Sequence, residues 1–203
     1  KAKQYLKLWS LEESGILKIR ETEWVWGDWG FNIDKTLLYN TWYYLALNGM
    51  SLIANEVGFT NDKIDFDLQM KKFYHSFNET FWNGSFYKSP SFMENADDRG
   101  QALAVLSGLA DITKYSKLIQ IFKNQQNASP YMEKYVFEAM IKMGYTEDAL
   151  KRHKERFSSM VSDNRFSTLF EGWEIGSEIY GGGTVNHAWS GGGLTILSQY
   201  LCG

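Results

Sequence analysis

The residues of this chain that could carry out acid–base chemistry gather near its carboxyl end. That segment, residues 168–193, reads TLFEGWEIGSEIYGGGTVNHAWSGGG. Glu171 follows Phe170 there, and burial beside aromatic side chains raises the pKa of a carboxyl group toward the range that suits proton transfer near neutral pH. Glu174 is a second carboxylate of the same stretch. The alternative is that each is an ordinary helix-capping or surface glutamate, and the residue types alone leave both interpretations open.

The same segment holds a histidine between two runs of three glycines. His187 lies after Gly181–Gly183 and before Gly191–Gly193, at the expected start of a helix, and Trp189 follows it closely. Glycine weakens a helix or strand by about 0.5–1 kcal/mol relative to alanine, so these runs indicate backbone that bends sharply or approaches another group closely. The position of His187 favours a ligand contact about as strongly as it favours a structural hydrogen bond.

A second stretch rich in aromatic residues and glycine, WVWGDWGF at residues 24–31, contains Trp26, Asp28 and Trp29. Flat aromatic faces pack on the C–H surfaces of sugars, and carboxylates accept hydrogen bonds from sugar hydroxyls, so this combination suits a carbohydrate site. The alternative is that the tryptophans belong to the core and that Asp28 closes an Asx turn. Composition gives the two interpretations of the tryptophans about equal weight.

Composition and spacing argue against several other classes of function. A net charge of −3 over 203 residues, with no block of Lys or Arg, argues against nucleic acid as a partner. No apolar run approaches the roughly 20 residues of a membrane span. A single cysteine, Cys202, and three histidines without paired spacing predict neither a metal site nor an intrachain disulfide. The glycine runs lack the pattern of a phosphate-binding loop, so no nucleotide or other cofactor is expected.

The elements that must position these residues are predicted to be helices, because apolar residues recur at helical spacing along most of the chain. Asp34 is a predicted N-cap, Thr60 or Asn61 opens the following helix, and Thr146 is a predicted cap further on. A short hairpin is predicted at residues 81–89 around Asn83 and its following glycine. The expected helices are residues 35–58, 62–82, 98–110, 114–125, 129–144 and 146–161, and a last one from Asn186 or His187 to Leu201.

About seven helices with short connections predict a single all-α domain, residues 1–203, built from αα-hairpins. Two connections, residues 21–33 and 162–187, are long and rich in Trp, Gly and carboxylates. Loops on a rigid scaffold commonly carry function, so we expect these two to face one cleft. The chain has no initiator Met and opens within a helix-like pattern, which predicts that it is a piece of a longer protein.

Several motifs together resemble the glycoside hydrolase family 78 α-L-rhamnosidases. The resemblance rests on WGDWG, TLFEGW and NHAWSGG, with SFNETFW, DDRGQALAVLSGLA, SPYMEKYVFEAM and MGYTEDAL between them in the expected order. It covers nearly the whole chain and matches the carboxyl-terminal part of the catalytic domain. The resemblance implies an (α/α)6 toroid that removes terminal α-L-rhamnose with inversion. That chemistry uses one carboxylic acid and one carboxylate roughly 6.5–9.5 Å apart.

The resemblance also implies roles for individual residues. The family's general base belongs to a Thr-x-Trp-Glu-like motif, which matches Thr168 to Glu171, with Phe170 keeping an aromatic wall where Trp is common. Glu174 is the local rival for that role. The residues implied to contact the sugar are Trp26, Asp28, Trp29 and His187, with Trp189 and Glu174 as further candidates.

The general acid has no counterpart in this sequence. The letters DDRGQ at residues 97–101 fit its motif, but they lie between two helices rather than upstream of WGDWG. We therefore expect the acid in a preceding part of the polypeptide, and no hydrolysis by the isolated chain. The expected partners are a rhamnosyl glycan or glycoside and the remaining domains of the same polypeptide. The alternatives are a related toroid hydrolase for another sugar, a non-catalytic carbohydrate-binding relic, or a helical interaction domain.

Overall fold

The computed structural model describes residues 1–20, 25–176 and 183–202, and this part of the chain is all-helical. The described residues form no β-strand, only two isolated bridges, Leu11 to Leu17 and Trp82 to Tyr87. Within these ranges eight α-helices follow in order, as do short 3-10 turns at Ile112–Lys114 and Ala188–Gly191 and a π-helical turn at Ser198–Cys202. The α-helices are α1 (Ala2–Leu6), α2 (Lys35–Glu56), α3 (Thr60–Phe81), α4 (Asp98–Ser107), α5 (Tyr115–Asn124), α6 (Pro130–Lys142), α7 (Thr146–Val161) and α8 (Gly192–Leu197).

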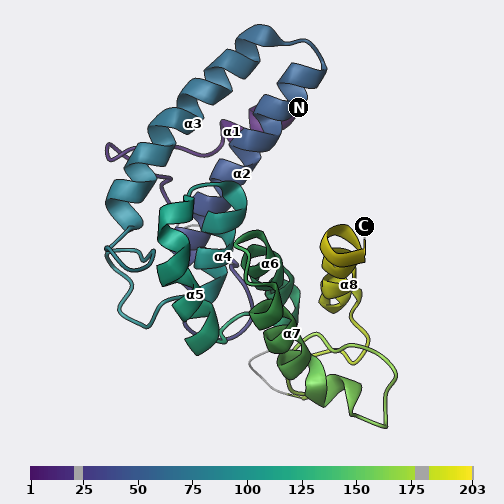
Figure 1. The fold of residues 1–203 in the computed structure, drawn as a ribbon. Helices are drawn as coiled ribbons and strands as arrows, with labels where there is room; N and C mark the ends of the chain where they lie inside the picture. Colours follow the sequence, from purple (N-terminus) through teal and green to yellow (C-terminus); the bar gives the residue numbers. More distant parts are fainter. Residues whose placement is uncertain (21–24, 177–182, 203) are drawn as a thin grey trace.

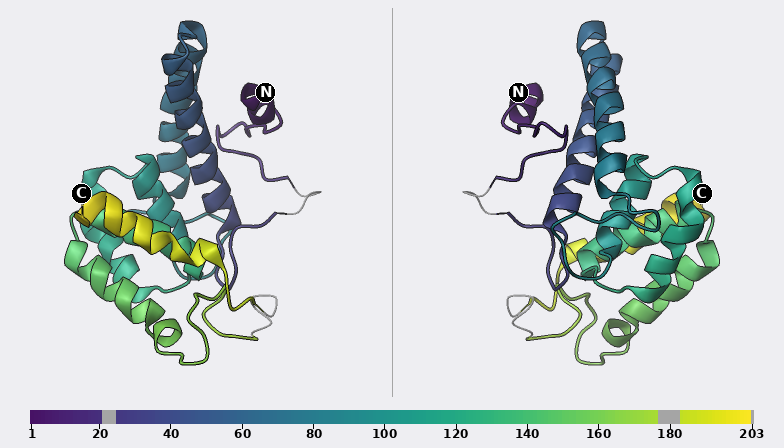
Figure 2. Two further views of the ribbon diagram at one scale, coloured as in Figure 1. Left: turned by 90° about the vertical axis from the view of Figure 1, so that its right-hand side faces the viewer. Right: turned by 90° about the vertical axis from the view of Figure 1, so that its left-hand side faces the viewer.

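The helices pack as neighbouring pairs. Helix α2 packs against α3 and α4, and α6 packs against α4, α7 and α8. Figure 1 shows α2 and α3 as a long hairpin that projects from the cluster formed by α4 to α7. The side views in Figure 2 show the carboxyl-terminal segment lying across one face of that cluster. Among the described helices, none combines the length and apolar character needed to cross a lipid bilayer.

Side-chain caps mark the start of three of the eight described helices, α2, α4 and α6, at Asp34, Asp97 and Ser129. The Asp34 carboxylate accepts a hydrogen bond from the Leu37 amide at 3.0 Å, which confirms the predicted cap of α2. Helix α3 begins at Thr60, two residues before the expected start at residue 62, and its N-cap is Phe59, so neither Thr60 nor Asn61 caps it. The prediction for Thr146 is wrong in detail, because this residue is the first of α7 and no side chain caps the helix. Tyr145, whose side chain lacks a short acceptor, occupies the cap position instead.

The core lies along the α2–α3 hairpin and the α4–α6 pair. Phe66, Phe73, Phe77 and Phe81 follow one face of α3 at intervals of seven and four residues and are almost fully buried. The predicted hairpin after α3 is reduced to one bridge, in which the Asn83 side chain accepts from the amides of the second and third residues beyond it, both at 3.0 Å. A second, smaller core under the carboxyl-terminal loop contains Phe157, Met160 and Phe170.

The last predicted helix is present as a run of helical residues, but its hydrogen-bonding pattern changes along its length. A 3-10 turn follows His187, and then α8 and the π-helical turn complete the segment. Gly193 lies so close to His153 of α7 that an added Cβ would stand 2.3 Å from the imidazole Nε2. The glycine run therefore allows a close approach between two segments, which was one of the two expectations for it.

Candidate active site

Two loops that are far apart in sequence meet through their tryptophans. Trp26, before α2, stacks on Trp189, before α8, with ring centroids 6.0 Å apart and an interplanar angle of 13°. Trp29 meets the edge of Trp26 at 6.2 Å. Tyr131, in the first turn of α6, stacks on Trp189 at 4.9 Å. We call Trp26, Trp29, Tyr131 and Trp189 the aromatic cluster.

A short pairing of backbone segments places Glu171 beside His187. The Glu171 amide donates to the Thr184 carbonyl at 2.9 Å, and the His187 amide donates to the Leu169 carbonyl at 2.9 Å. The Ser190 hydroxyl donates to the Phe170 carbonyl at 2.7 Å, which ties the 3-10 turn to the same strand-like segment. The residues that sequence resemblance implicates in catalysis therefore lie on adjacent, mutually fixed segments.

The Glu171 carboxylate is held on one side and partly open to solvent. Its Oε2 atom accepts from the Thr184 amide at 3.0 Å and lies 3.6 Å from Nδ1 of His187. The side chains of Glu171 and His187 are 15% and 29% exposed. The His187 ring in turn contacts Trp189, with centroids 4.3 Å apart. A continuous set of side chains thus connects the carboxylate to the aromatic cluster.

The aromatic neighbours of Glu171 in sequence do not line this site. Phe170 is only 4% exposed and belongs to the small core with Phe157, so the expectation that it forms an aromatic wall is wrong. Trp173 donates from Nε1 to the Ala128 carbonyl at 2.8 Å and lies under the Arg156 guanidinium, 4.0 Å from the ring centroid. Both side chains anchor the loop to α7 and to the turn before α6.

Asp28 does not present its carboxylate to a ligand. Its side chain is fully buried. Its two oxygens accept from the Ser129 hydroxyl at 2.5 Å, the Ser129 amide at 2.9 Å and the Arg99 guanidinium at 3.1 Å. Burial raises the pKa of the Asp28 carboxyl, while Arg99 and Ser129 oppose that rise. The expected sugar contact is therefore replaced by a structural role, because the carboxylate is fully buried and both of its oxygens accept hydrogen bonds from the protein.

Arg99 is the hub of this buried network. It donates from Nε to Asp97 at 2.6 Å, and from its terminal nitrogens to the carbonyls of Phe31 and Asn32, both at 2.8 Å. Its own side chain is fully buried. Since four of its acceptors lie in residues 28–32, Arg99 fixes the loop that carries Trp26 and Trp29 onto α4.

A second buried arginine fixes the helices beneath the site. Arg152 of α7 donates to Glu133 of α6 at 2.6 Å and to Asp98 of α4 at 2.7 Å. It also donates to the backbone carbonyls of Phe122, in the last turn of α5, and of Gln125, which follows that helix. Buried charges that are paired and hydrogen-bonded in this way hold three helices in a defined relation.

Sequence reasoning missed residues whose importance depends on long-range contacts. Tyr131 follows a proline in the first turn of a helix, a pattern that indicates an ordinary amphipathic helix. Thr184 follows Gly183, whose φ of 60° marks a turn, and that glycine was the one local signal pointing to it. Glu174, the rival base, is exposed, and no hydrogen bond among the described residues involves its carboxylate.

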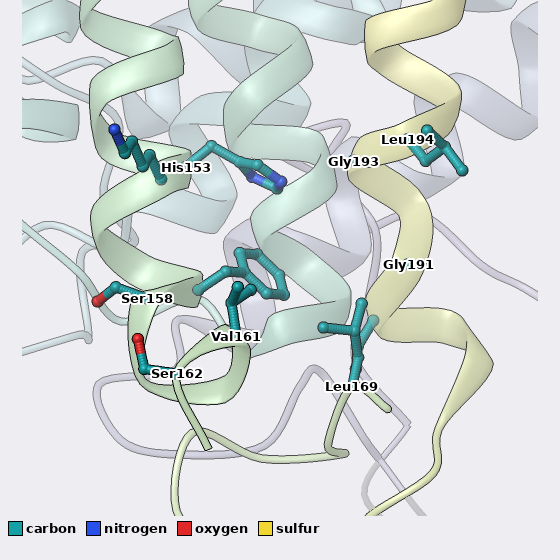
Figure 3. Close-up of a pocket in the computed structure, with 11 residues that line it drawn as sticks. His153, Ser158, Val161, Ser162, Leu169, Gly191, Gly193 and Leu194 are labelled. Atoms are coloured by element: carbon teal, nitrogen blue, oxygen red, sulfur yellow. The ribbon is translucent and has the colours of Figure 1, made fainter. Parts of the chain in front are cut away.

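A separate apolar cavity of about 520 Å³ lies between α7 and the segment at residues 190–194. His153, Val161, Leu169 and Leu194 contribute to its walls, as Figure 3 shows. Among the described residues that line it, none belongs to the aromatic cluster or is Glu171 or His187. This cavity is therefore distinct from the candidate active site.

Comparison with known proteins was made by family and by fold. The sequence model of the bacterial α-L-rhamnosidase six-hairpin glycosidase domain matches residues 1–201. A search of the curated proteins found no match. Three rhamnosidases among the matching solved structures share the fold, each at 20% sequence identity or less.

The rhamnosidase from Klebsiella oxytoca with rhamnose bound superposes with a TM-score of 0.82 at 17% identity, over 98% of this chain and 40% of that one. The family 78 rhamnosidase of Bacillus sp. GL1 gives 0.73 at 17% identity, over 100% and 23%. The α-L-rhamnosidase from Dictyoglumus thermophilum gives 0.75 at 20% identity, over 95% and 23%. The chain thus spans less than half the length of each of these proteins.

The predicted fold, an all-α portion of an (α/α)6 toroid, is confirmed. The chain belongs to the family of bacterial α-L-rhamnosidase six-hairpin glycosidase domains.

Proposed function

We propose that this chain is the carboxyl-terminal part of the catalytic domain of an inverting α-L-rhamnosidase, and that Glu171 is its general base. The observation that supports this most directly is the position of the Glu171 carboxylate. It is partly exposed, lies 3.6 Å from His187, and is connected through that ring to the aromatic cluster. Membership of the rhamnosidase family supplies the reaction class, and the Klebsiella oxytoca relative was solved with rhamnose bound.

In the proposed reaction, the Glu171 carboxylate removes a proton from a water molecule that attacks the anomeric carbon. A general acid on the opposite side of the sugar protonates the departing oxygen, so the configuration inverts. Tryptophan and tyrosine faces of the aromatic cluster pack on the C–H surface of the sugar, and His187 hydrogen-bonds a hydroxyl. No cofactor takes part, because the proton transfers need only the two carboxyl groups and water.

The general acid is proposed to come from the remainder of a longer polypeptide. The solved relatives are more than twice the length of this chain, which supports such an arrangement. The remaining domains of that polypeptide are then the chain's constant partners, and the substrate is a rhamnosyl glycan or glycoside. Of the residues implied to touch the sugar, Asp28 is reassigned to support of the loop, while Trp26, Trp29, His187 and Trp189 keep the proposed contact role.

The test uses the full-length enzyme and an aryl α-L-rhamnoside. Glu171→Gln should lower kcat by about 10²–10⁴-fold, because that is the usual contribution of a positioned base. Glu174→Gln tests the rival residue three positions away, and turnover at the parent rate would remove Glu174 from both the base role and the sugar contact that the resemblance implied. Azide needs no base, so it should restore turnover of Glu171→Ala and give a glycosyl azide of inverted configuration.

Three results would contradict the proposal. Parent-like turnover by Glu171→Gln would remove Glu171 from the base role. Retained configuration in the first-formed sugar, seen by NMR, would exclude inversion. Hydrolysis of other aryl glycosides but not the rhamnoside would favour the alternative of a related hydrolase, and sugar binding without any hydrolysis would favour a carbohydrate-binding relic.

A further inference from the structure

Thr184 lies between the two polar groups of the candidate site. Its amide donates to Glu171 Oε2 at 3.0 Å, and its hydroxyl oxygen lies 3.4 Å from the same atom. That hydroxyl is also 2.7 Å from Nδ1 of His187. We propose that Thr184 is a positioning residue that fixes Glu171 through Oε2, so that Oε1 is the atom that accepts the proton from water. This assignment rests on the proposed function of Glu171.

The backbone around Thr184 is itself fixed by hydrogen bonds, so it can hold the Glu171 carboxylate in place. Its carbonyl accepts the Glu171 amide at 2.9 Å. The Thr168 hydroxyl donates to the carbonyl of Val185, the next residue. Thr184 and Glu171 are therefore joined by one hydrogen bond between their backbones and one from backbone to side chain, which leaves the carboxylate little rotational freedom. A hydrogen bond from an amide to a carboxylate is charge-assisted and stronger than a neutral one.

The hydroxyl group extends this restraint to the imidazole. A threonine hydroxyl has one hydrogen and two acceptor lone pairs, so it donates to one neighbour and accepts from another. When Nδ1 of His187 carries a proton, it donates to Thr184 Oγ1, and the hydroxyl hydrogen is directed to Glu171 Oε2. When Nδ1 lacks a proton, the hydroxyl donates to it instead. The hydroxyl links the ring to the carboxylate only in the first arrangement; in the second, the Thr184 amide alone donates to Glu171 Oε2.

The two carboxylate oxygens are consequently different. Oε2 has contacts with Thr184 and His187, whereas no hydrogen bond to Oε1 is formed by any residue in the described ranges. The side chain is 15% exposed, so part of the carboxylate faces solvent. An oxygen whose lone pairs are not engaged by protein donors is the better proton acceptor. The geometry therefore assigns the reacting position to Oε1.

The experiment compares Thr184→Val with Thr184→Ser in the full-length enzyme. Valine has nearly the same shape and keeps the backbone contacts but lacks the hydroxyl. We expect kcat on an aryl α-L-rhamnoside to fall about 10- to 100-fold in Thr184→Val, because hydrogen bonds around charged groups are the stronger class. KM should change by less than about threefold, since the hydroxyl acts on the base rather than on bound sugar. Thr184→Ser should recover most of the rate.

Each outcome is informative when the parent enzyme and Glu171→Gln are measured alongside. An active parent, an inactive Glu171→Gln and a Thr184→Val with parent kcat would overturn the positioning role while keeping the proposed function. Equal losses in Thr184→Val and Thr184→Ser, together with a lowered unfolding temperature, would also overturn it, because the defect would then lie in folding. A fully active Glu171→Gln would reject the proposed function and this assignment with it.

Discussion

Asp28→Ala separates a structural role for this carboxylate from a role in binding sugar. The substitution removes the acceptor for three hydrogen bonds, two from Ser129 and one from Arg99. Both members of the Arg99–Asp28 ion pair are fully buried. Removing one partner of such a pair leaves an uncompensated buried charge and costs about 3–5 kcal/mol.

The structure places the expected loss within that range. Arg99 keeps its contact with Asp97 and with backbone carbonyls, which favours the lower end. The Ser129 amide, however, loses its acceptor, and a buried unsatisfied donor costs about 1–3 kcal/mol. These terms are not independent, so we expect the free energy of unfolding to fall by about 3–5 kcal/mol in total.

The assay is urea unfolding followed by tryptophan fluorescence, with the free-energy change taken from the shift in midpoint. Asp148→Ala is the control, because Asp148 pairs with Lys123 at 2.8 Å on the surface and its removal should cost about 1 kcal/mol or less. A variant Asp28→Ala as stable as its parent, with a raised KM for the rhamnoside, would refute this reasoning. That result would restore the sugar contact predicted from sequence.

Two further predictions concern groups away from the site. Burial lowers the pKa of His153, whose ring stacks on Phe137 with centroids 4.4 Å apart. As the pH drops from about 7 to 5, the unfolded chain therefore binds a proton at this residue before the folded chain does, and the unfolding temperature should fall. The fall should be smaller in His153→Gln, which lacks the titrating group. Equal pH slopes for parent and variant would contradict this. Gly100→Ala should destabilise the protein by about 1–3 kcal/mol, because the added Cβ would stand 2.4 Å from Leu37 Cδ2. Gly49→Ala should stabilise it by about 0.5–1 kcal/mol, because no atom lies within contact distance of the added Cβ. Thermal unfolding of both variants checks that the two changes have opposite signs.

Several helix starts could be predicted because their causes are local. Asp34 lies three residues before the amide that it caps, and α6 begins at Pro130, within the expected range of residues 129–144. The last helix was predicted as one element, whereas its hydrogen-bonding pattern changes from a 3-10 turn to α8 and then to a π-helical turn. The contact of Gly193 with His153 depends on how α7 and α8 pack, and no local rule contains that information.

Only part of the candidate site could be predicted, because some of its contacts join residues that are far apart in the sequence. Glu171 and His187 were found through motifs, and the structure places them 3.6 Å apart. The role of Asp28 was missed because its partners, Arg99 and Ser129, are 71 and 101 residues away. An aspartate between glycine and tryptophan has the same local appearance whether it faces a ligand or a buried guanidinium. Only the tertiary structure distinguishes the two cases.

The single peptide group between Ala128 and Ser129 holds both halves of the site. The Ala128 carbonyl accepts from Trp173 in the loop that carries Glu171, the proposed base, and the Ser129 amide donates to Asp28 in the loop that carries Trp26 and Trp29. A change in the length of the connection between α5 and α6 would therefore displace the proposed base and the aromatic cluster together. A change of sugar specificity that alters one loop alone must leave this shared attachment intact. An insertion in the connection between α5 and α6 should abolish both sugar recognition and turnover.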